Sequence, residues 1–323
     1  MLIAQALLRN QSSEDSAERD YMEINEFAKK VCNALKKELG GSCRVECKEV
    51  KKNNGVILHG LLILAEDRNV APTIYLDAFL EAYESGVTFG AIIQRLLDIC
   101  REEALKEHID MDFFRSFEEV RDRICYRLIG RKGNEELLED IPYIEFLDLA
   151  ICFYYAYHGD ALGDGTILIH NSHVDLWDTC TAELFGLAKR NTQRLFPWVC
   201  KSLEEVLDEI AGQGDEAAEA SSDVFFQEVP LRVLSNVKRI HGAICILYPD
   251  VLEHLAQAMG RSFYILPSSV HEVILLSDTG MGSPRELREM IAEVNSTQVA
   301  PEEVLSDSLY YYDFTDKKVK MIF

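Results

Sequence analysis

The clearest pattern of hydrophobic and polar positions lies between Phe263 and Asp313. FYIL and EVILL are short apolar runs rich in β-branched and aromatic residues, and the Pro-Ser-Ser break between them predicts two buried strands with a tight connection. Residues 283–286, Ser-Pro-Arg-Glu, have the form of a capping box with proline at the first helical position. Apolar residues then recur at helical spacing, so we predict a helix. SLYYYD and KVKMIF predict a closing hairpin.

The first half of the chain predicts a second unit with similar elements. After Met22, apolar residues at helical spacing predict an amphipathic helix that ends at Gly40-Gly41. CRVECKEV and GVILHGLLIL then flank Asn54-Gly55, a dipeptide typical of hairpin turns. Two further helices follow, and FEEVRDRICYRLIG, residues 117–130, predicts a third helix that bridges to the second unit.

The predicted fold class is α+β, with two lobes that each consist of a small, mainly antiparallel sheet with helices packed on it. We place the N-terminal lobe at residues 22–130 and the C-terminal lobe at residues 140–323. Residues 1–21 are predicted to be a loosely held extension. Residues 212–224 are small and acidic, and no Lys or Arg occurs between Lys201 and Arg232, so we predict an exposed acidic loop there.

Charge and cysteine content narrow the function classes. With 33 basic and 55 acidic side chains the formal net charge is −22, which argues against nucleic-acid binding and against adhesion to anionic membranes. No apolar run approaches the roughly 20 residues that span a bilayer. The nine cysteines are scattered and form no CxxC pair, which fits free thiols in a reducing cytoplasm. We predict a cytoplasmic protein without a cofactor.

The first candidate for chemistry is the segment of His170, His173 and Asp175 in TILIHNSHVDLW, which we predict to be a strand. Two histidines and a carboxylate are suitable metal ligands or acid–base groups. On a continuous strand positions 170 and 173 point to opposite faces, so they converge only if the strand breaks. The alternative is that these polar residues end a strand and bond to neighbouring backbone.

The second candidate is Ser268-Ser269-Val270-His271-Glu272, in the connection between the two predicted strands. His271 beside Glu272 is similar to part of a catalytic pair, and Ser268 or Ser269 offers a hydroxyl. A nucleophilic triad needs groups that converge from separate segments, and the chain has no GxSxG elbow. The alternative is that the serines bond to the backbone of the turn and that His271 lies at a sheet edge.

Candidate binding residues come from a short basic patch and a tyrosine run. Basic side chains in the patch and on a nearby helix favour a small anion or an acidic partner, and a solvated turn is the alternative; they are Arg190, Arg194, Lys238, Arg239 and His241. In the run of Tyr310, Tyr311 and Tyr312, successive side chains of a strand point to opposite faces of the sheet, so either Tyr311 or its two neighbours are buried. We take Tyr310 and Tyr312 as candidates for an exposed interaction edge.

Several motifs resemble a known family over nearly the whole chain from Met22. They are NNGVILHGLLIL, PTIYLDAF, TILIHNSHVDLW, YILPSSVHEVILL and VNSTQVAPEEVLSDSLYYYD. The family is an uncharacterised domain of unknown function common in gut clostridia. Residues 147–197 and the segment from Phe263 are more remotely similar to another uncharacterised family of Bacillus-type bacteria. The resemblance implies one intact cytoplasmic module and no known activity.

Two function classes remain open. The leading hypothesis is a non-catalytic binding or regulatory protein that recognises a protein or peptide, because no catalytic constellation is complete. The alternative is a hydrolase-like, metal-assisted enzyme. It would use His170, His173, Asp175, Ser269, His271 and Glu272 and requires these side chains to line one site.

Overall fold

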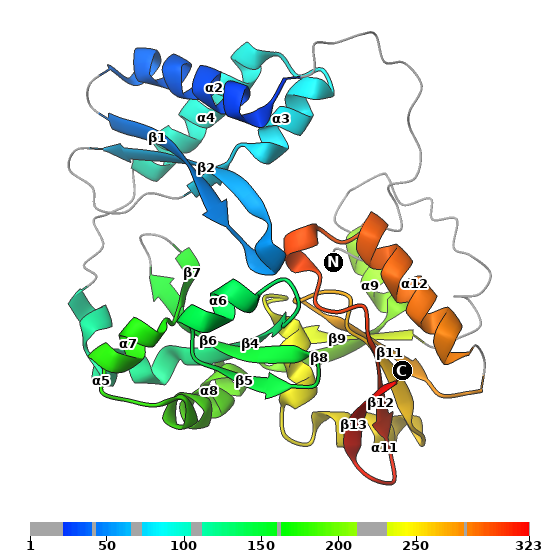
Figure 1. The fold of residues 1–323 in the computed structure, drawn as a ribbon. Coiled ribbons are helices and arrows are strands. Elements are labelled where there is room, and N and C mark those ends of the chain that lie inside the picture. Colours follow the sequence, from blue (N-terminus) through cyan, green and yellow to red (C-terminus); the bar gives the residue numbers. More distant parts are fainter. Residues whose placement is uncertain are drawn as a thin grey trace. The chain divides into compact units, whose positions relative to one another are not determined.

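The computed structural model gives an α+β fold in which helices accompany three antiparallel sheets (Figure 1). It describes residues 22–40, 43–65, 73–104, 112–159, 163–211, 231–280 and 283–322. The extension at residues 1–21 and the acidic loop at residues 212–224 lie outside the described residues. Two compact units are present: an N-terminal unit within residues 22–113, to which residues 158–159 and 163–165 also belong, and a C-terminal unit within residues 114–157 and 166–322.

The described residues of the N-terminal unit form a three-stranded antiparallel sheet and three α-helices. Its elements are α2 (Ile24–Leu39), β1 (Cys43–Lys51), β2 (Ile57–Ala65), β3 (Thr73–Tyr75), α3 (Asp77–Glu84) and α4 (Phe89–Ala104). The apolar stripe of α2, with Phe27, Val31 and Leu35 fully buried, packs with Val45 and Leu61 of the sheet into one core. The predicted hairpin is confirmed, since β1 pairs with β2 on either side of a turn that contains Asn54 and Gly55.

The larger sheet of the C-terminal unit has six strands in the order β13-β12-β10-β11-β9-β8, all antiparallel. They are β8 (Trp198–Ser202), β9 (Leu231–Asn236), β10 (Phe263–Leu266), β11 (Val273–Ser277), β12 (Leu309–Asp313) and β13 (Lys318–Ile322). Helix α12 (Pro284–Thr297) packs Leu287 and Ile291 against this sheet. Its predicted capping box is confirmed, because Ser283 Oγ accepts from the amide of Glu286.

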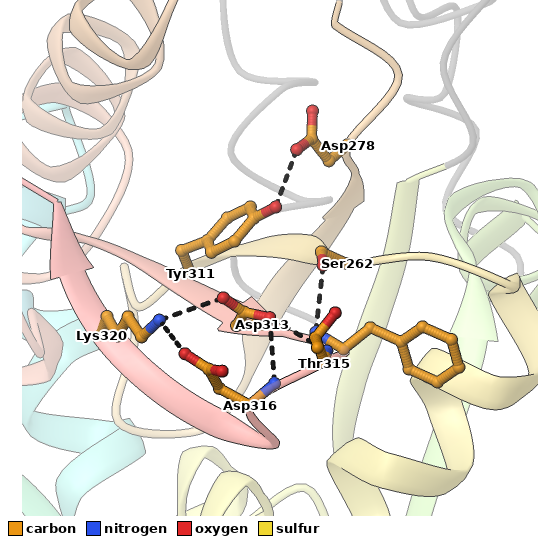
Figure 2. A network of polar contacts seen from close by, with 8 residues as sticks. Ser262, Asp278, Tyr311, Asp313, Thr315, Asp316 and Lys320 are labelled. Carbon is orange, nitrogen blue, oxygen red and sulfur yellow. Dashed lines mark hydrogen bonds and ion pairs between the residues drawn. The ribbon is translucent and has the colours of Figure 1, made fainter.

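Figure 2 shows how the predicted hairpin of β12 and β13 closes. Asp313 Oδ1 accepts hydrogen bonds from the amides of Thr315 and Asp316, at 2.9 and 3.1 Å. The Lys320 ammonium then bridges the carboxylates of Asp313 and Asp316, at 3.0 and 2.6 Å. The Asp313 side chain therefore stabilises the turn by accepting hydrogen bonds from the backbone amides of the turn, as aspartate commonly does.

The smaller sheet of the C-terminal unit places β6 between β4 and β5, and β7 also pairs with β6. The strands of this sheet and the helices near them in the chain are α5 (Phe117–Val120), β4 (Ile124–Gly130), α6 (Glu135–Asp140), β5 (Tyr143–Phe146), β6 (Leu149–Gly159), β7 (Gly163–Leu168), α7 (Asn171–Leu176) and α8 (Thr181–Leu195).

The predicted helix over residues 117–130 is wrong. Only residues 117–120 form an α-helix, and residues 124–130 form a strand that pairs with β6 and so belongs to the C-terminal unit. Every residue of β4 except Arg127 is buried, so no alternation of exposed and buried positions distinguished this strand from a helix.

Two general features complete the fold. All nine cysteines are free thiols. Among the described residues, no helix combines the length and the apolar character that crossing a membrane requires.

Candidate functional site

Four polar side chains from separate segments of the C-terminal unit form one connected group, which we call the Arg127 cluster: Arg127, His241, His271 and Glu303. Arg127 Nη1 lies 3.5 Å from His241 Nε2. The His241 ring stacks on the ring of His271, with centroids 5.7 Å apart and planes 10° apart. His271 Nε2 lies 3.4 Å from Glu303 Oε1. The four side chains therefore form a row with a cation at one end and a carboxylate at the other.

A tight loop after β9 turns His241 towards the interior. Asn236 is buried, and its side-chain amide donates to the carbonyl of Ile240 at 2.8 Å. Within this loop Arg239 and His241 both have positive φ, 54° and 51°, which is costly for residues other than glycine. The surrounding hydrogen bonds hold the loop in this conformation. His241, which follows two basic residues in the sequence, therefore becomes part of a packed cluster.

The backbone after His241 approaches the His271 turn very closely. A Cβ atom at Gly242 would lie 2.1 Å from Ser235 Oγ and 2.4 Å from the carbonyl oxygen of His271, so only glycine fits. Ser235 Oγ also donates to that carbonyl at 2.7 Å. The positions of the two histidines are therefore fixed by backbone contacts as well as by ring stacking.

The hydrogen bonds indicate which nitrogens of the two imidazoles carry protons. The His241 amide donates to His271 Nδ1 at 3.3 Å, so Nδ1 is an acceptor and Nε2–H faces Glu303. Burial, followed by the charge of Arg127 and the proximity of His271, holds the pKa of His241 well below its usual value, so His241 is neutral at pH 7. Its Nε2 then accepts from Arg127, which leaves the proton on Nδ1.

Unsatisfied polar atoms are concentrated in this cluster. Within the described part of the chain, buried side-chain atoms without a hydrogen-bond partner include Arg127 Nε, His241 Nδ1 and Glu303 Oε2. Buried polar groups normally find partners, so two donors and one acceptor in a connected row need an explanation. The four residues are each partly exposed, with side-chain values of 22% for His271 and 25% for Glu303. The cluster therefore reaches the surface while keeping unused hydrogen-bonding capacity.

Arg127 also has no counter-ion within the described ranges. Burial lowers the pKa of its guanidinium, and only the weak acids Cys152 and Tyr154 oppose that shift. No carboxylate pairs with Arg127 among the residues that the structure describes. An arginine in this setting is suited to a planar anionic group such as a carboxylate.

Ser269 and Glu272, which lie close to His271 in the sequence, are both buried. Ser269 is fully buried, and its Oγ accepts from the amide of His271 at 3.0 Å. Glu272 is only 3% exposed. Because the two ring nitrogens of His271 face the His241 amide and Glu303, neither is placed to take a proton from Ser269.

His170 and His173 lie at a helix start rather than on a strand. The strand β7 ends at Leu168, and the predicted continuation as a strand is wrong because α7 begins at Asn171. His170 is the N-cap, and its amide donates to His173 Nδ1 at 3.0 Å. His170 Nδ1 lies 2.7 Å from Asp140 Oδ2. The contact between His170 and His173 belongs to a capping box, whereas the contact with Asp140 joins His170 to the end of α6.

The remaining parts of that segment show no metal site. His173 stacks on Trp177, and burial lowers its pKa, with a further lowering by His170. Asp175 is exposed. In the described ranges no group of three or more His, Cys, Asp or Glu side chains is arranged to hold a metal ion.

The predicted basic patch is divided among different partners. Arg239 pairs with Glu209 at 2.6 Å, and Arg194 donates to the carbonyl of Asp122 at 2.6 Å. Arg190 and Lys238 are exposed. Of the five predicted residues only His241 joins the Arg127 cluster. Arg127 itself was not predicted, although it is the only charged residue in the apolar run ICYRLIG.

The tyrosine prediction requires a correction. Tyr310 and Tyr312 are 0% and 4% exposed, so they do not form an exposed interaction edge. Their side chains point into the core because alternate residues of β12 face opposite sides. Tyr311 is the partly exposed member, and its hydroxyl donates to Asp278 at 2.9 Å (Figure 2).

Tyr310 instead belongs to a clamp around Asp148, in the turn between β5 and β6. Asp148 Oδ2 accepts from Ser306 Oγ at 2.6 Å and from Ser308 Oγ at 2.8 Å. Asp148 Oδ1 accepts from the hydroxyl of Tyr310. This carboxylate thus joins the smaller sheet to β12 of the larger one, and its role is structural.

Comparison with known proteins identifies the family. The sequence profile of a family of unknown function, DUF5688, matches residues 24–314. The chain belongs to this family. Membership in DUF5688 confirms the resemblance to a domain of unknown function, and it brings no activity. No curated protein matches the chain, and no solved structure does. The function of this DUF5688 chain therefore has to be argued from its geometry.

Proposed function

We propose that this protein is a non-catalytic binding protein that recognises a protein or peptide partner, and that the partner presents a carboxylate to Arg127. The observation that carries the proposal is the concentration of unsatisfied buried atoms in the Arg127 cluster. Two of them, Arg127 Nε and His241 Nδ1, are donors by the protonation argued above. A carboxylate supplies acceptors for both, and charge-assisted hydrogen bonds of this kind are strong.

Binding without catalysis is favoured by the state of the histidines. Both ring nitrogens of His271 have neighbours within the protein. His241 is a poor base, because burial and Arg127 hold its pKa well below the usual value. General acid–base catalysis needs a group that takes and returns a proton near neutral pH. The hydrolase alternative stays a hypothesis, and no contact described above favours it.

A cytoplasmic location is part of the proposal. Nine free thiols are expected in a reducing compartment. The net charge of −22 repels most acidic molecules. An acidic partner is therefore expected to bind only where a local cation such as Arg127 attracts it.

The test uses an array of capped random peptides probed with the whole protein. We expect bound peptides to be enriched in Asp and Glu, and we expect Arg127→Gln to abolish this enrichment. Arg131→Gln is the matched control, because Arg131 follows β4 directly but already pairs with Glu145 at 3.0 Å. Enrichment that survives Arg127→Gln, or the absence of any bound peptide, would refute the proposal.

A further inference from the structure

The acceptor end of the Arg127 cluster points to a second requirement on the ligand. We infer that the partner carries a cationic nitrogen close to its carboxylate, so that the recognised element is a peptide segment with one acidic and one basic side chain. This inference rests on the proposed function. It arises from Glu303, whose Oε2 is buried and has no hydrogen-bond partner.

The two charges of the cluster are held apart by the histidine pair. Arg127 contacts His241 at 3.5 Å and Glu303 contacts His271 at 3.4 Å, while the two rings stack between them. His241 is neutral because burial and Arg127 hold its pKa well below the usual value, so it is no counter-ion. Among the described residues, Arg127 has no carboxylate partner and Glu303 has no lysine or arginine partner.

The protein prevents these charges from collapsing into a direct ion pair. His241 is fixed by the loop that Asn236 closes, and His271 is fixed through its carbonyl and its amide. Glu303 lies in a short 3-10 helix, Pro301–Glu303, and its carbonyl accepts from the amide of Val270 at 2.9 Å. Because the side chains of Arg127 and Glu303 are each partly exposed, a ligand with the complementary arrangement can meet two opposite charges on this frame.

Other ligand classes satisfy only one end of the row. A phosphate would pair with Arg127 but would bring further negative charge towards Glu303. A metal cation would pair with Glu303 and be repelled by Arg127. A peptide with only an acidic side chain would leave Glu303 Oε2 without a hydrogen-bond partner, and an unsatisfied buried acceptor is costly. An acidic and a basic side chain on neighbouring positions satisfy both ends.

The experiment is a calorimetric titration of the whole protein with short capped alanine peptides. One set contains one Glu and one Lys, in both orders and separated by none, one or two alanines. A second set replaces Lys by the uncharged norleucine, and a third replaces Glu by Gln. We expect the best Glu/Lys peptide to bind about tenfold more tightly than its norleucine form, which corresponds to ~1.4 kcal/mol. The Gln form is expected to lose most of the binding.

The variant Glu303→Gln separates this inference from the proposed function. It should reduce affinity for the Glu/Lys peptide about tenfold and leave the norleucine peptide unchanged. Glu302→Gln is the matched control and should bind both peptides as the native protein does. If the norleucine peptide binds as tightly as the Glu/Lys peptide, or if Glu303→Gln weakens both equally, the inference fails while the proposed function stands. If no peptide binds, or if Arg127→Gln leaves binding intact, the proposed function fails as well.

Discussion

Replacing Asp148 by asparagine tests whether one carboxylate stabilises the contact between the two sheets of the C-terminal unit. The native side chain accepts from the hydroxyls of Ser306, Ser308 and Tyr310. Asparagine has nearly the same shape, but one of its two polar atoms becomes an amide donor. At least one hydroxyl donor must therefore face another donor or lose its partner.

The expected size follows from burial and charge. A hydrogen bond to a charged group contributes about 1.5–3 kcal/mol, and a buried donor left without a partner costs about 1–3 kcal/mol. Tyr310 is fully buried, so its hydroxyl has no access to water. Ser308 is partly exposed, so water can replace a hydrogen bond that its hydroxyl loses. We therefore expect Asp148→Asn to lower the free energy of unfolding of this unit by about 2–4 kcal/mol.

Urea denaturation followed by tryptophan fluorescence isolates the relevant transition. The chain has two tryptophans, Trp177 and Trp198, and both belong to the C-terminal unit. A cycle with Tyr310→Phe should give a coupling energy of about 1–3 kcal/mol with Asp148→Asn, because the two groups share one hydrogen bond. A loss below ~0.5 kcal/mol for Asp148→Asn, or simple additivity in the cycle, would show that the clamp does not stabilise the fold.

Three further perturbations test the site and the fold. Gly242→Ala should lower the thermal midpoint, since its Cβ would lie 2.4 Å from a backbone oxygen, and an unchanged midpoint would contradict that close approach. The pKa of His241 is lowered well below its usual value by burial and by Arg127, so the unfolded chain binds a proton that the folded chain excludes. Stability should therefore begin to fall as the pH decreases past about 7 and should continue to fall below about 6.5. His241→Asn, which tolerates positive φ, should lose less stability over this range, and equal slopes in urea titrations would rule out the histidine as the cause. Ser283→Ala should cost about 1 kcal/mol in urea denaturation by removing the cap on the Glu286 amide, whereas Ser283→Asp should keep most of the stability.

The sequence predicted correctly those elements whose conformation depends mainly on residues close together in the chain. The capping box at residues 283–286 and the Asn54-Gly55 hairpin depend on neighbouring residues only, and both are present. The strand β4 depends instead on β6, because its continuous burial arises from contacts on both of its faces. A run such as ICYRLIG is compatible with a helix or a strand until its partner is known.

The candidate site was harder to predict from the sequence than the strand β4, because its residues come from distant segments. His271 was noticed for its sequence neighbours Ser269 and Glu272, but its ring contacts His241 and Glu303. Arg127 reaches the cluster from a strand more than a hundred positions earlier in the chain. Side chains that converge from distant segments share no spacing that a single sequence reveals. Only the tertiary fold brings them together.

The sequence separation across the Asp148 clamp has a consequence for the order of folding. Asp148 and Tyr310 are 162 positions apart, whereas β1 and β2 are joined by a short turn that begins after Lys51. Closing a long loop costs more entropy than closing a short one, and folds rich in distant contacts form more slowly. In a stopped-flow refolding experiment, the three-stranded sheet should therefore form in an early kinetic phase. Closure of the Asp148 clamp should follow in a slower phase, when the last strands meet the Asp148 turn.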